Sequence, residues 1–137
     1  MALRRDVIRG RARARCEYCH LPEALSGGIF HIEHVIPKSQ GGPDSEANCA
    51  LACPRCNERK GARIDARDPK SGTVTALFHP RRNVWDKHFR WSSDHLRIEG
   101  RTAIGRATVS ALDFNSLTRQ QLRLIWRDRL ADLFPFD

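Results

Sequence analysis

The 137-residue sequence has no apolar run that approaches the ~20 residues needed to cross a bilayer. Its arginine-rich beginning is not followed by a hydrophobic stretch, which argues against a secretory signal. Internal repeats and low-complexity segments are also lacking. We therefore expect a cytoplasmic protein without membrane contact, in a reducing compartment where structural disulfides are rare.

Acidic residues are in the minority, with 16 Asp and Glu against 24 Lys and Arg, which gives a formal net charge of +8. Such an excess of positive charge favours polyanionic partners, and nucleic acid is the most common of them. Hydrophobic residues make up 40% and charged residues 29%, which is too apolar for a disordered chain. The length fits one compact domain, or a small metal-bound module with an appended second part.

The five cysteines are an odd number, and four of them form two C-x-x-C pairs that 33 residues separate. The first pair is Cys16 and Cys19, and the second is Cys53 and Cys56. Four thiolates satisfy tetrahedral Zn²⁺ and leave no position for water, so the pattern predicts a structural zinc site. A redox dithiol is the less favoured alternative, because such motifs normally occur singly near a βαβ pattern. Cys49 lies in an apolar run and is expected to be a small buried residue.

Hydrophobic periodicity predicts an α+β protein of short elements. The expected elements are a basic helix within 2–15, strands at 29–36 and 48–52, a helix at 54–61, strands at 73–78, 89–91 and 95–98, and helices at 102–113 and 117–134. Thr118 and Gln121 are the candidates for a capping box at the start of the last helix. The polar segment 62–72 is expected to link two halves of the chain.

Between the cysteine pairs, Glu33 and His34 stand next to each other near the end of the strand expected at 29–36. In a regular strand, adjacent side chains point to opposite faces. We hypothesise that the strand bends before Pro37, so that both groups can approach one site. His31 shares the face of Glu33, and a packed or solvent-facing imidazole is preferred to a further ligand at that position.

The segment from Cys16 to Gly61, 46 of the 137 residues, resembles the HNH nuclease family. The motif of that family is a strand ending in Asp/Glu-His, then a loop, an Asn, and a helix bearing His or Asn. The matching offsets are 14 residues from His34 to Asn48 and 9 from Asn48 to Asn57. Further matches are Ile36-Pro37, Ser39, Gly41-Gly42 and Cys56-Asn57-x-x-Lys60. Residues beyond Asp68 are similar to the tails of stand-alone bacterial members.

This resemblance implies a ββα-metal module at 16–61, with a basic helix at 1–15 before it and an extension at 62–137 that packs on it. Glu33 and Asn57 would hold a catalytic Mg²⁺ or Mn²⁺, a hard cation that prefers oxygen ligands. His34 would be the general base, since imidazole titrates near neutral pH. Asn48 would orient His34 by tying the loop backbone. Asp is commoner than Glu at position 33, so the preferred cation stays open.

The expected reaction is hydrolysis of a phosphodiester bond in nucleic acid, with DNA as the expected polymer. The sequence leaves both a monomer and a dimer open. Phosphate contacts are expected from Lys38, Arg55, Arg59, Lys60 and Arg63. The arginines before Cys16 should add salt-dependent attraction. Two alternatives stay open: a non-catalytic zinc module that binds nucleic acid, and an interaction domain, which an exposed apolar patch on the last helix would favour. Asn57 could also serve as a helix N-cap.

Overall fold

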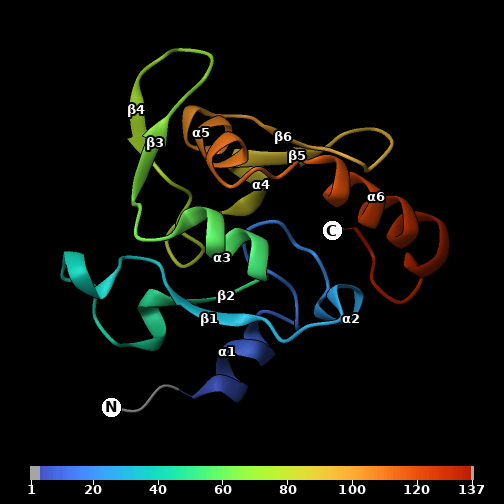
Figure 1. The fold of residues 1–137 in the computed structure, drawn as a ribbon, viewed down its shortest axis with the longest axis horizontal. Coiled ribbons are helices and arrows are strands. Elements are labelled where there is room, and N and C mark those ends of the chain that lie inside the picture. Colours follow the sequence, from blue (N-terminus) through green and yellow to red (C-terminus); the bar gives the residue numbers. More distant parts are fainter. Residues whose placement is uncertain (1–3, 137) are drawn as a thin grey trace.

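A computed structural model describes residues 4–136 (Figure 1). Its helices are α1 (Arg5–Arg11), α2 (Glu23–Ser26), α3 (Pro54–Lys60), α4 (Trp85–His88), α5 (Ala103–Ala111) and α6 (Leu117–Ile125). Its strands are β1 (His31–His34), β2 (Cys49–Ala52), β3 (Asp65–Arg67), β4 (Val74–Ala76), β5 (Phe89–Trp91) and β6 (Ile98–Gly100). They form three antiparallel pairs, β1–β2, β3–β4 and β5–β6. The predicted α+β class is therefore confirmed.

The β1–β2 hairpin lies between α1 and α3 (Figure 1). Its register runs from His31 opposite Ala52 to His34 opposite Cys49. All four residues of β2 are buried, because helices cover the strand from both sides. The apolar run around Cys49 therefore forms the centre of the N-terminal half, and Cys49 itself is fully buried as expected.

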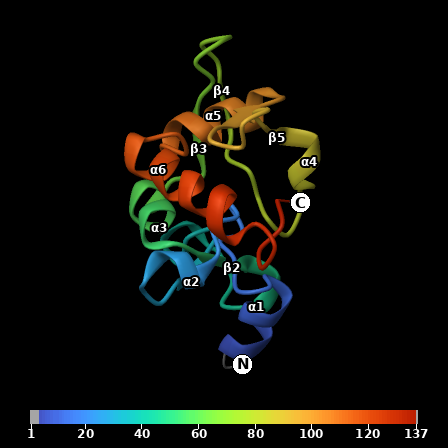
Figure 2. The same cartoon turned by 90° about the vertical axis from the view of Figure 1, so that its right-hand side faces the viewer.

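The second half packs α5 against β3, β4 and β6. Phe78, Phe89 and Phe114 form its aromatic centre, with ring centroids 5.1 and 5.6 Å apart along the series. The β3–β4 hairpin projects from the end of the molecule opposite α1 (Figure 1, Figure 2). Within residues 4–136, no helix has the length and apolar character needed to cross a membrane.

The interpretation of residues 62–72 as a linker is wrong, because β3 lies within this segment and Asp68 is fully buried. Both carboxylate oxygens of Asp68 accept hydrogen bonds from Arg106 of α5, each at 2.9 Å. Ser71 donates to the same carboxylate at 2.8 Å. An ion pair between residues 38 positions apart fixes the hairpin on α5, which a local pattern does not reveal.

Three further expectations need correction. The last helix ends at Ile125 and continues as a single wide turn, Trp126–Leu130. Its N-cap is Ser116, whose side chain accepts from the Arg119 N–H, so Thr118 lies inside the first turn and forms no capping box. The strand expected at 95–98 is displaced to Ile98–Gly100, because Ser92 and Arg97 close a turn before it.

Replacing Asp68 by Asn is expected to lower the melting temperature by several degrees at pH 7, because the substitution removes the charge that Arg106 binds. The Arg106 hydrogen bonds hold the pKa of the Asp68 carboxyl well below its usual range. Its contribution is present above the unfolded-state pKa of about 3.9 and is lost as the pH falls towards the folded-state value. Thermal unfolding at pH 7 and pH 3 measures this contribution. The difference in melting temperature between the native protein and the variant should be smaller at pH 3.

The matched control is Asp65→Asn, since Asp65 is an exposed carboxylate on the same hairpin. It should leave the melting temperature nearly unchanged at both pH values. Equal effects of the two substitutions at pH 7 would contradict the structural role assigned to the pair of Asp68 and Arg106.

Candidate active site and zinc centre

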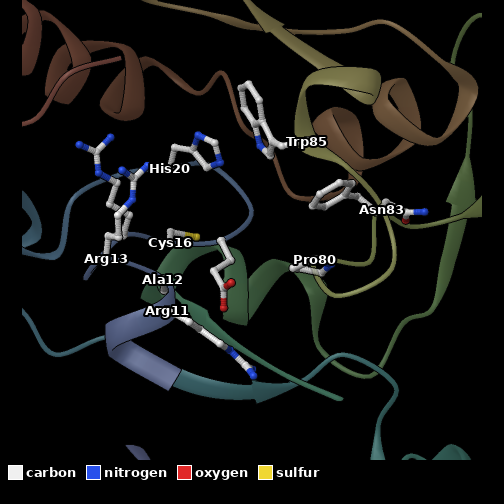
Figure 3. Close-up of a pocket in the computed structure, with 11 residues that line it drawn as sticks. Arg11, Ala12, Arg13, Cys16, His20, Pro80, Asn83 and Trp85 are labelled. Atoms are coloured by element: carbon white, nitrogen blue, oxygen red, sulfur yellow. The ribbon is translucent and has the colours of Figure 1, made fainter. Parts of the chain in front are cut away.

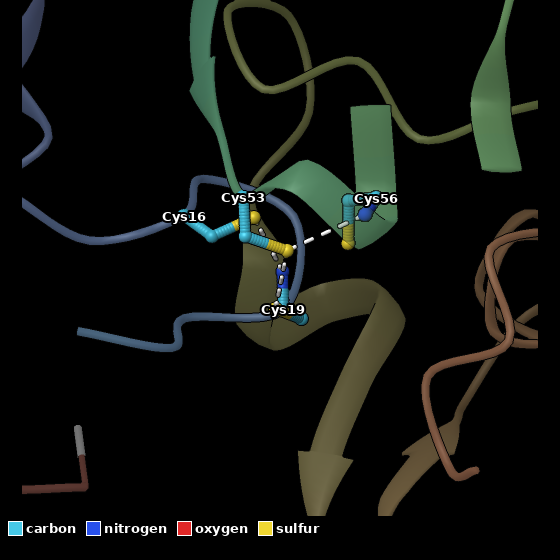
Figure 4. A group of neighbouring side chains, drawn as sticks. All are labelled: Cys16, Cys19, Cys53 and Cys56. Carbon is cyan, nitrogen blue, oxygen red and sulfur yellow. Dashed lines mark hydrogen bonds between the residues drawn. The ribbon is translucent and has the colours of Figure 1, made fainter. Parts of the chain in front are cut away.

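The four paired cysteines converge on one point, where the loop that carries Cys16 and Cys19 meets the start of α3 (Figure 4). All four are buried, and their sulfur atoms lie within 4.8 Å of one another. Cys53 is the N-cap of α3, and its Sγ accepts from the Cys56 N–H at 3.3 Å. Cys16 accepts from the Cys19 N–H in the same way at 3.5 Å. The predicted cluster is confirmed, and four converging thiols are compatible with a closed tetrahedral zinc site.

The C-terminal half reaches this cluster through Arg119 of α6, whose Nη1 donates to the Cys56 Sγ at 3.4 Å. Arg119 is buried. Burial disfavours its charged form, but the neighbouring Cys56 and Cys19 outweigh burial and raise the pKa of the guanidinium. Four thiolates exceed the charge of one Zn²⁺ by two, so a buried guanidinium beside them is electrostatically favourable.

Arg119 was not predicted as a buried residue, because an arginine on a helix is usually exposed. The buried positions of this last segment are Arg119, Arg123 and Trp126, while the side chain of Ile125 is exposed. Arg123 donates to the backbone oxygens of Phe114 and Leu96. Arginines spaced by four on a helix with cysteine pairs elsewhere in the chain are the signal that could have indicated this arrangement.

His34 lies at the end of β1 with a partly exposed side chain. Its Nε2 is 2.8 Å from the Asp44 Oδ1. The hydrogen bond with His34 lowers the pKa of the Asp44 carboxyl, and the charge of Lys38, whose Nζ is 3.7 Å from Oδ2, acts in the same direction. The sequence alone does not predict this contact, since nothing around Asp44 ties it to a histidine ten positions earlier.

Asn48 holds the loop between these two residues. Its Oδ1 accepts from the Ile36 N–H at 3.0 Å, and its Nδ2 donates to the carbonyls of Ile36 and Pro43 at 2.9 and 3.0 Å. Gly42 passes so close that a Cβ there would lie 1.7 Å from the Ile36 carbonyl oxygen. A buried amide and a glycine thus fix the loop that carries Asp44 relative to β1.

Glu33 points to the opposite face of β1, towards α3. Its Oε1 is 2.6 Å from the Lys60 Nζ, which also donates to the Val35 carbonyl at 2.8 Å. Burial raises the pKa of the Glu33 carboxyl, and the charge of Lys60 partly opposes this. Among residues 4–136, neither Glu33 Oε2 nor the Tyr18 hydroxyl makes a hydrogen bond of regular geometry, but the two groups are close enough for Tyr18 to lower the pKa of Glu33.

This side of the hairpin fits a hard cation. A buried carboxylate oxygen without a well-formed hydrogen bond is a favourable ligand for a cation, because burying such an oxygen without compensation is costly. Asn57 precedes Lys60 by three residues on α3, so both side chains lie on one side of that helix. Asn57 is inside the helix, where Cys53 is the N-cap, so the N-cap alternative is wrong.

The hypothesised bend that would bring Glu33 and His34 together is absent from this part of the structure. The regular ladder continues through His34 opposite Cys49, and the Val35 N–H donates to the Asn48 carbonyl. The two side chains therefore point to opposite faces, and the site has a histidine side and a carboxylate side. His31 is exposed, in agreement with the solvent-facing alternative.

The residues expected to contact phosphate differ in their surroundings. Lys38 and Arg59 are exposed. Arg55 pairs with Asp113 at 3.1 Å, and Arg63 donates to the carbonyls of Arg59 and Ala111. Lys60 is only 1% exposed, so its assignment as a surface phosphate contact is wrong: the ammonium is needed to compensate Glu33.

A separate polar cavity of about 190 Å³ lies beside the first cysteine pair (Figure 3). Arg11 and Trp85 line it, and the Trp85 ring stacks on His20 with centroids 4.1 Å apart. The indole N–H of Trp85 donates to the Tyr18 carbonyl, which gives this residue a structural role. Arg11 donates to the carbonyl of Cys49, the residue opposite His34. A basic side chain from the N-terminal segment thus lies near the histidine side of the site.

Residues 16–63 match the family model described as HNH endonuclease. No curated protein and no solved structure gives a significant match to the chain. The matched span contains the whole β1–β2–α3 unit and both cysteine pairs. Residues 16–63 are thus similar to an HNH domain, and the four-cysteine cluster fits the zinc-binding variety of that domain.

Proposed function

We propose that this chain is a metal-dependent endonuclease that hydrolyses phosphodiester bonds in nucleic acid, with DNA as its substrate. The observation that carries the proposal is the contact between His34 and Asp44 at the accessible end of β1, with a buried carboxylate on the other face of the same strand. An oriented imidazole and a carboxylate suited to a hard cation are two kinds of group that phosphodiester hydrolysis uses, and here they belong to adjacent residues of β1.

His34 acts as the general base in this proposal. The Asp44 carboxylate only accepts hydrogen bonds, so it favours the tautomer in which His34 carries its proton on Nε2. Nδ1 then keeps a lone pair that takes a proton from the attacking water. Asn48 keeps this arrangement rigid by fixing both ends of the loop that carries Asp44.

Glu33 and Asn57 are the residues that would hold Mg²⁺ or Mn²⁺ on the carboxylate side. Such a cation, when bound, stabilises the charge that develops on the phosphate and on the departing 3′ oxygen. Lys60 keeps the Glu33 carboxylate ionised and oriented towards α3. The exposed cations Lys38 and Arg59 supply salt-dependent attraction for the strand.

Glu33→Gln tests the proposal, because it preserves the shape of the ligand and removes its charge. We expect cleavage of supercoiled plasmid in Mg²⁺ or Mn²⁺ to fall about 100-fold or more, since a metal site contributes several kcal/mol to the transition state. Mn²⁺ binding followed by electron paramagnetic resonance should weaken in parallel. Circular dichroism checks that the variant is folded.

The control is Glu58→Gln, on the exposed side of α3, which should cleave and bind Mn²⁺ like the native protein. If Glu33→Gln binds Mn²⁺ and cleaves at the native level, Glu33 is not a ligand and this part of the proposal fails.

A second candidate function follows from the last helix, which exposes apolar side chains. Leu117 is 72% exposed and Ile125 51% exposed, and Leu133 beyond the helix is 72% exposed. This patch favours a protein-binding role for the C-terminal part, alongside cleavage by the HNH domain. Leu117→Ser combined with Leu133→Ser should leave cleavage unchanged if the patch serves only protein contacts.

A further inference from the structure

A second cavity of about 200 Å³ borders the carboxylate side of the candidate site. It lies between the residues that follow His34 in the chain, the end of α3, and the segment from Ala76 to Asn83. Its walls are mainly apolar, with Ile36, Ile64, Leu77 and Ile104 among them. This volume is enough for several water molecules, and so for one flat heterocyclic ring.

His79 and Lys60 are the buried polar residues of this wall, and His79 has 7% of its surface exposed. Its Nδ1 accepts the Arg81 N–H at 3.1 Å, so the neutral ring carries its hydrogen on Nε2. Burial lowers the pKa of His79, and the nearby charge of Arg82 lowers it further, which favours that neutral form. Within residues 4–136, Nε2 has no hydrogen-bond partner. A buried N–H in this state needs an acceptor.

The interior of the cavity offers little to a phosphate group. The charge of Lys60 is compensated by Glu33, and His79 is a neutral donor. The remaining cation of the lining, Arg82, is exposed and so lies towards solvent. An anion placed among the apolar walls would lose its hydration without an opposite charge to replace it. A heterocycle with two apolar faces and an acceptor on its edge suits these walls better.

We propose that this cavity receives a nucleobase of the substrate strand, next to the phosphodiester bond that is cleaved, and that His79 Nε2 donates a hydrogen bond to the edge of that base. The assignment of the base to the substrate strand rests on the proposed nuclease function. The base must leave its stack to enter, so the site favours single-stranded or locally opened nucleic acid. Arg82 at the mouth then meets the phosphate of the same nucleotide.

Nuclear magnetic resonance titration with the four deoxynucleoside 5′-monophosphates tests this without any cleavage step. In the absence of divalent cations, we expect the backbone amide signals of residues 77–83 to shift in a saturable manner with at least one nucleotide. Deoxyribose 5-phosphate, which lacks the base, should leave them unmoved. Equal shifts with deoxyribose 5-phosphate would show that the cavity is an anion site. The absence of a shift with every nucleotide would show that the cavity holds only water. Either result overturns the proposal.

Two variants locate the binding in the cavity. His79→Asn keeps an acceptor for the Arg81 N–H and removes the Nε2 donor, so nucleotide binding should weaken about tenfold with little change in melting temperature. Ala76→Phe fills the cavity from an exposed strand position and should abolish the shifts, whereas Val74→Phe, on the same strand face outside the lining, should not. Native affinity in folded Ala76→Phe would overturn the proposal.

The same variants separate this proposal from the nuclease proposal. If nucleotides bind as described but the native protein cleaves nothing, the assignment of the cavity as a base pocket is supported and the assignment of the catalytic residues is wrong. If the protein cleaves an oligonucleotide equally well with an abasic residue on either side of the cut, cleavage stands and the base pocket is overturned.

Discussion

Replacing His34 by alanine is expected to reduce the rate of cleavage by about 100- to 10,000-fold, the usual contribution of a general base. The reason is specific to this imidazole. It lies at the accessible end of β1, and Asp44 fixes its orientation from 2.8 Å away. Single-turnover cleavage of a labelled oligonucleotide measures the chemical step separately from binding, and binding by the variant should stay near the native level.

His31→Ala is the matched control, since His31 is an exposed histidine of the same strand. It should cleave at close to the native rate. The cleavage rate of Asp44→Asn should lie between the rates of these two variants, because the substitution removes the carboxylate that selects the His34 tautomer but leaves the imidazole in place. A His34→Ala protein that cleaves as fast as His31→Ala would show that another group is the base.

Loss of the zinc cluster is expected to unfold the N-terminal half. Structural zinc sites of this kind bind with about 10–16 kcal/mol, as much as the whole free energy of unfolding of many domains. Cys53→Ser removes one ligand and also the N-cap of α3. It further leaves Arg119 buried beside fewer thiolates to compensate its charge. We expect loss of bound zinc, measured by elemental analysis, together with loss of the cooperative melting transition.

Cys49→Ala is the control for this experiment, because Cys49 is a buried cysteine outside the cluster. It should retain one zinc per chain and a cooperative transition at a slightly lower temperature. If Cys53→Ser keeps both zinc and cooperative unfolding, the cluster does not stabilise the segment between the cysteine pairs.

The four-cysteine cluster and the α+β class could be predicted from the sequence because both depend on local patterns. A C-x-x-C pair defines a tight turn within four residues, and Cys53 at the start of α3 shows that turn in the structure. The β1–β2 hairpin was likewise expected, since the apolar run around Cys49 has the character of a buried strand. Their boundaries differed by one or two residues at the ends.

The partners of the site residues could not be predicted, because they come from distant parts of the chain. Lys60 was expected at the surface, but its position one turn after Asn57 brings it to Glu33, 27 residues earlier. Arg119 reaches Cys56 across 63 residues. In both cases a buried charge is stabilised by an opposite charge from a distant part of the chain, and hydrophobic periodicity gives no information about such pairs. Asp44 was missed for a related reason, since a loop carboxylate has no periodic pattern at all.

The most direct test of the central claim is the incubation of supercoiled plasmid with the native, zinc-loaded protein, in Mg²⁺, in Mn²⁺ and without added divalent cation. We predict nicked circles only when a divalent cation is present, with 5′-phosphate and 3′-hydroxyl ends that DNA ligase reseals. Plasmid and single-stranded DNA left intact under all three conditions would contradict the assignment of this HNH domain as a DNA nuclease.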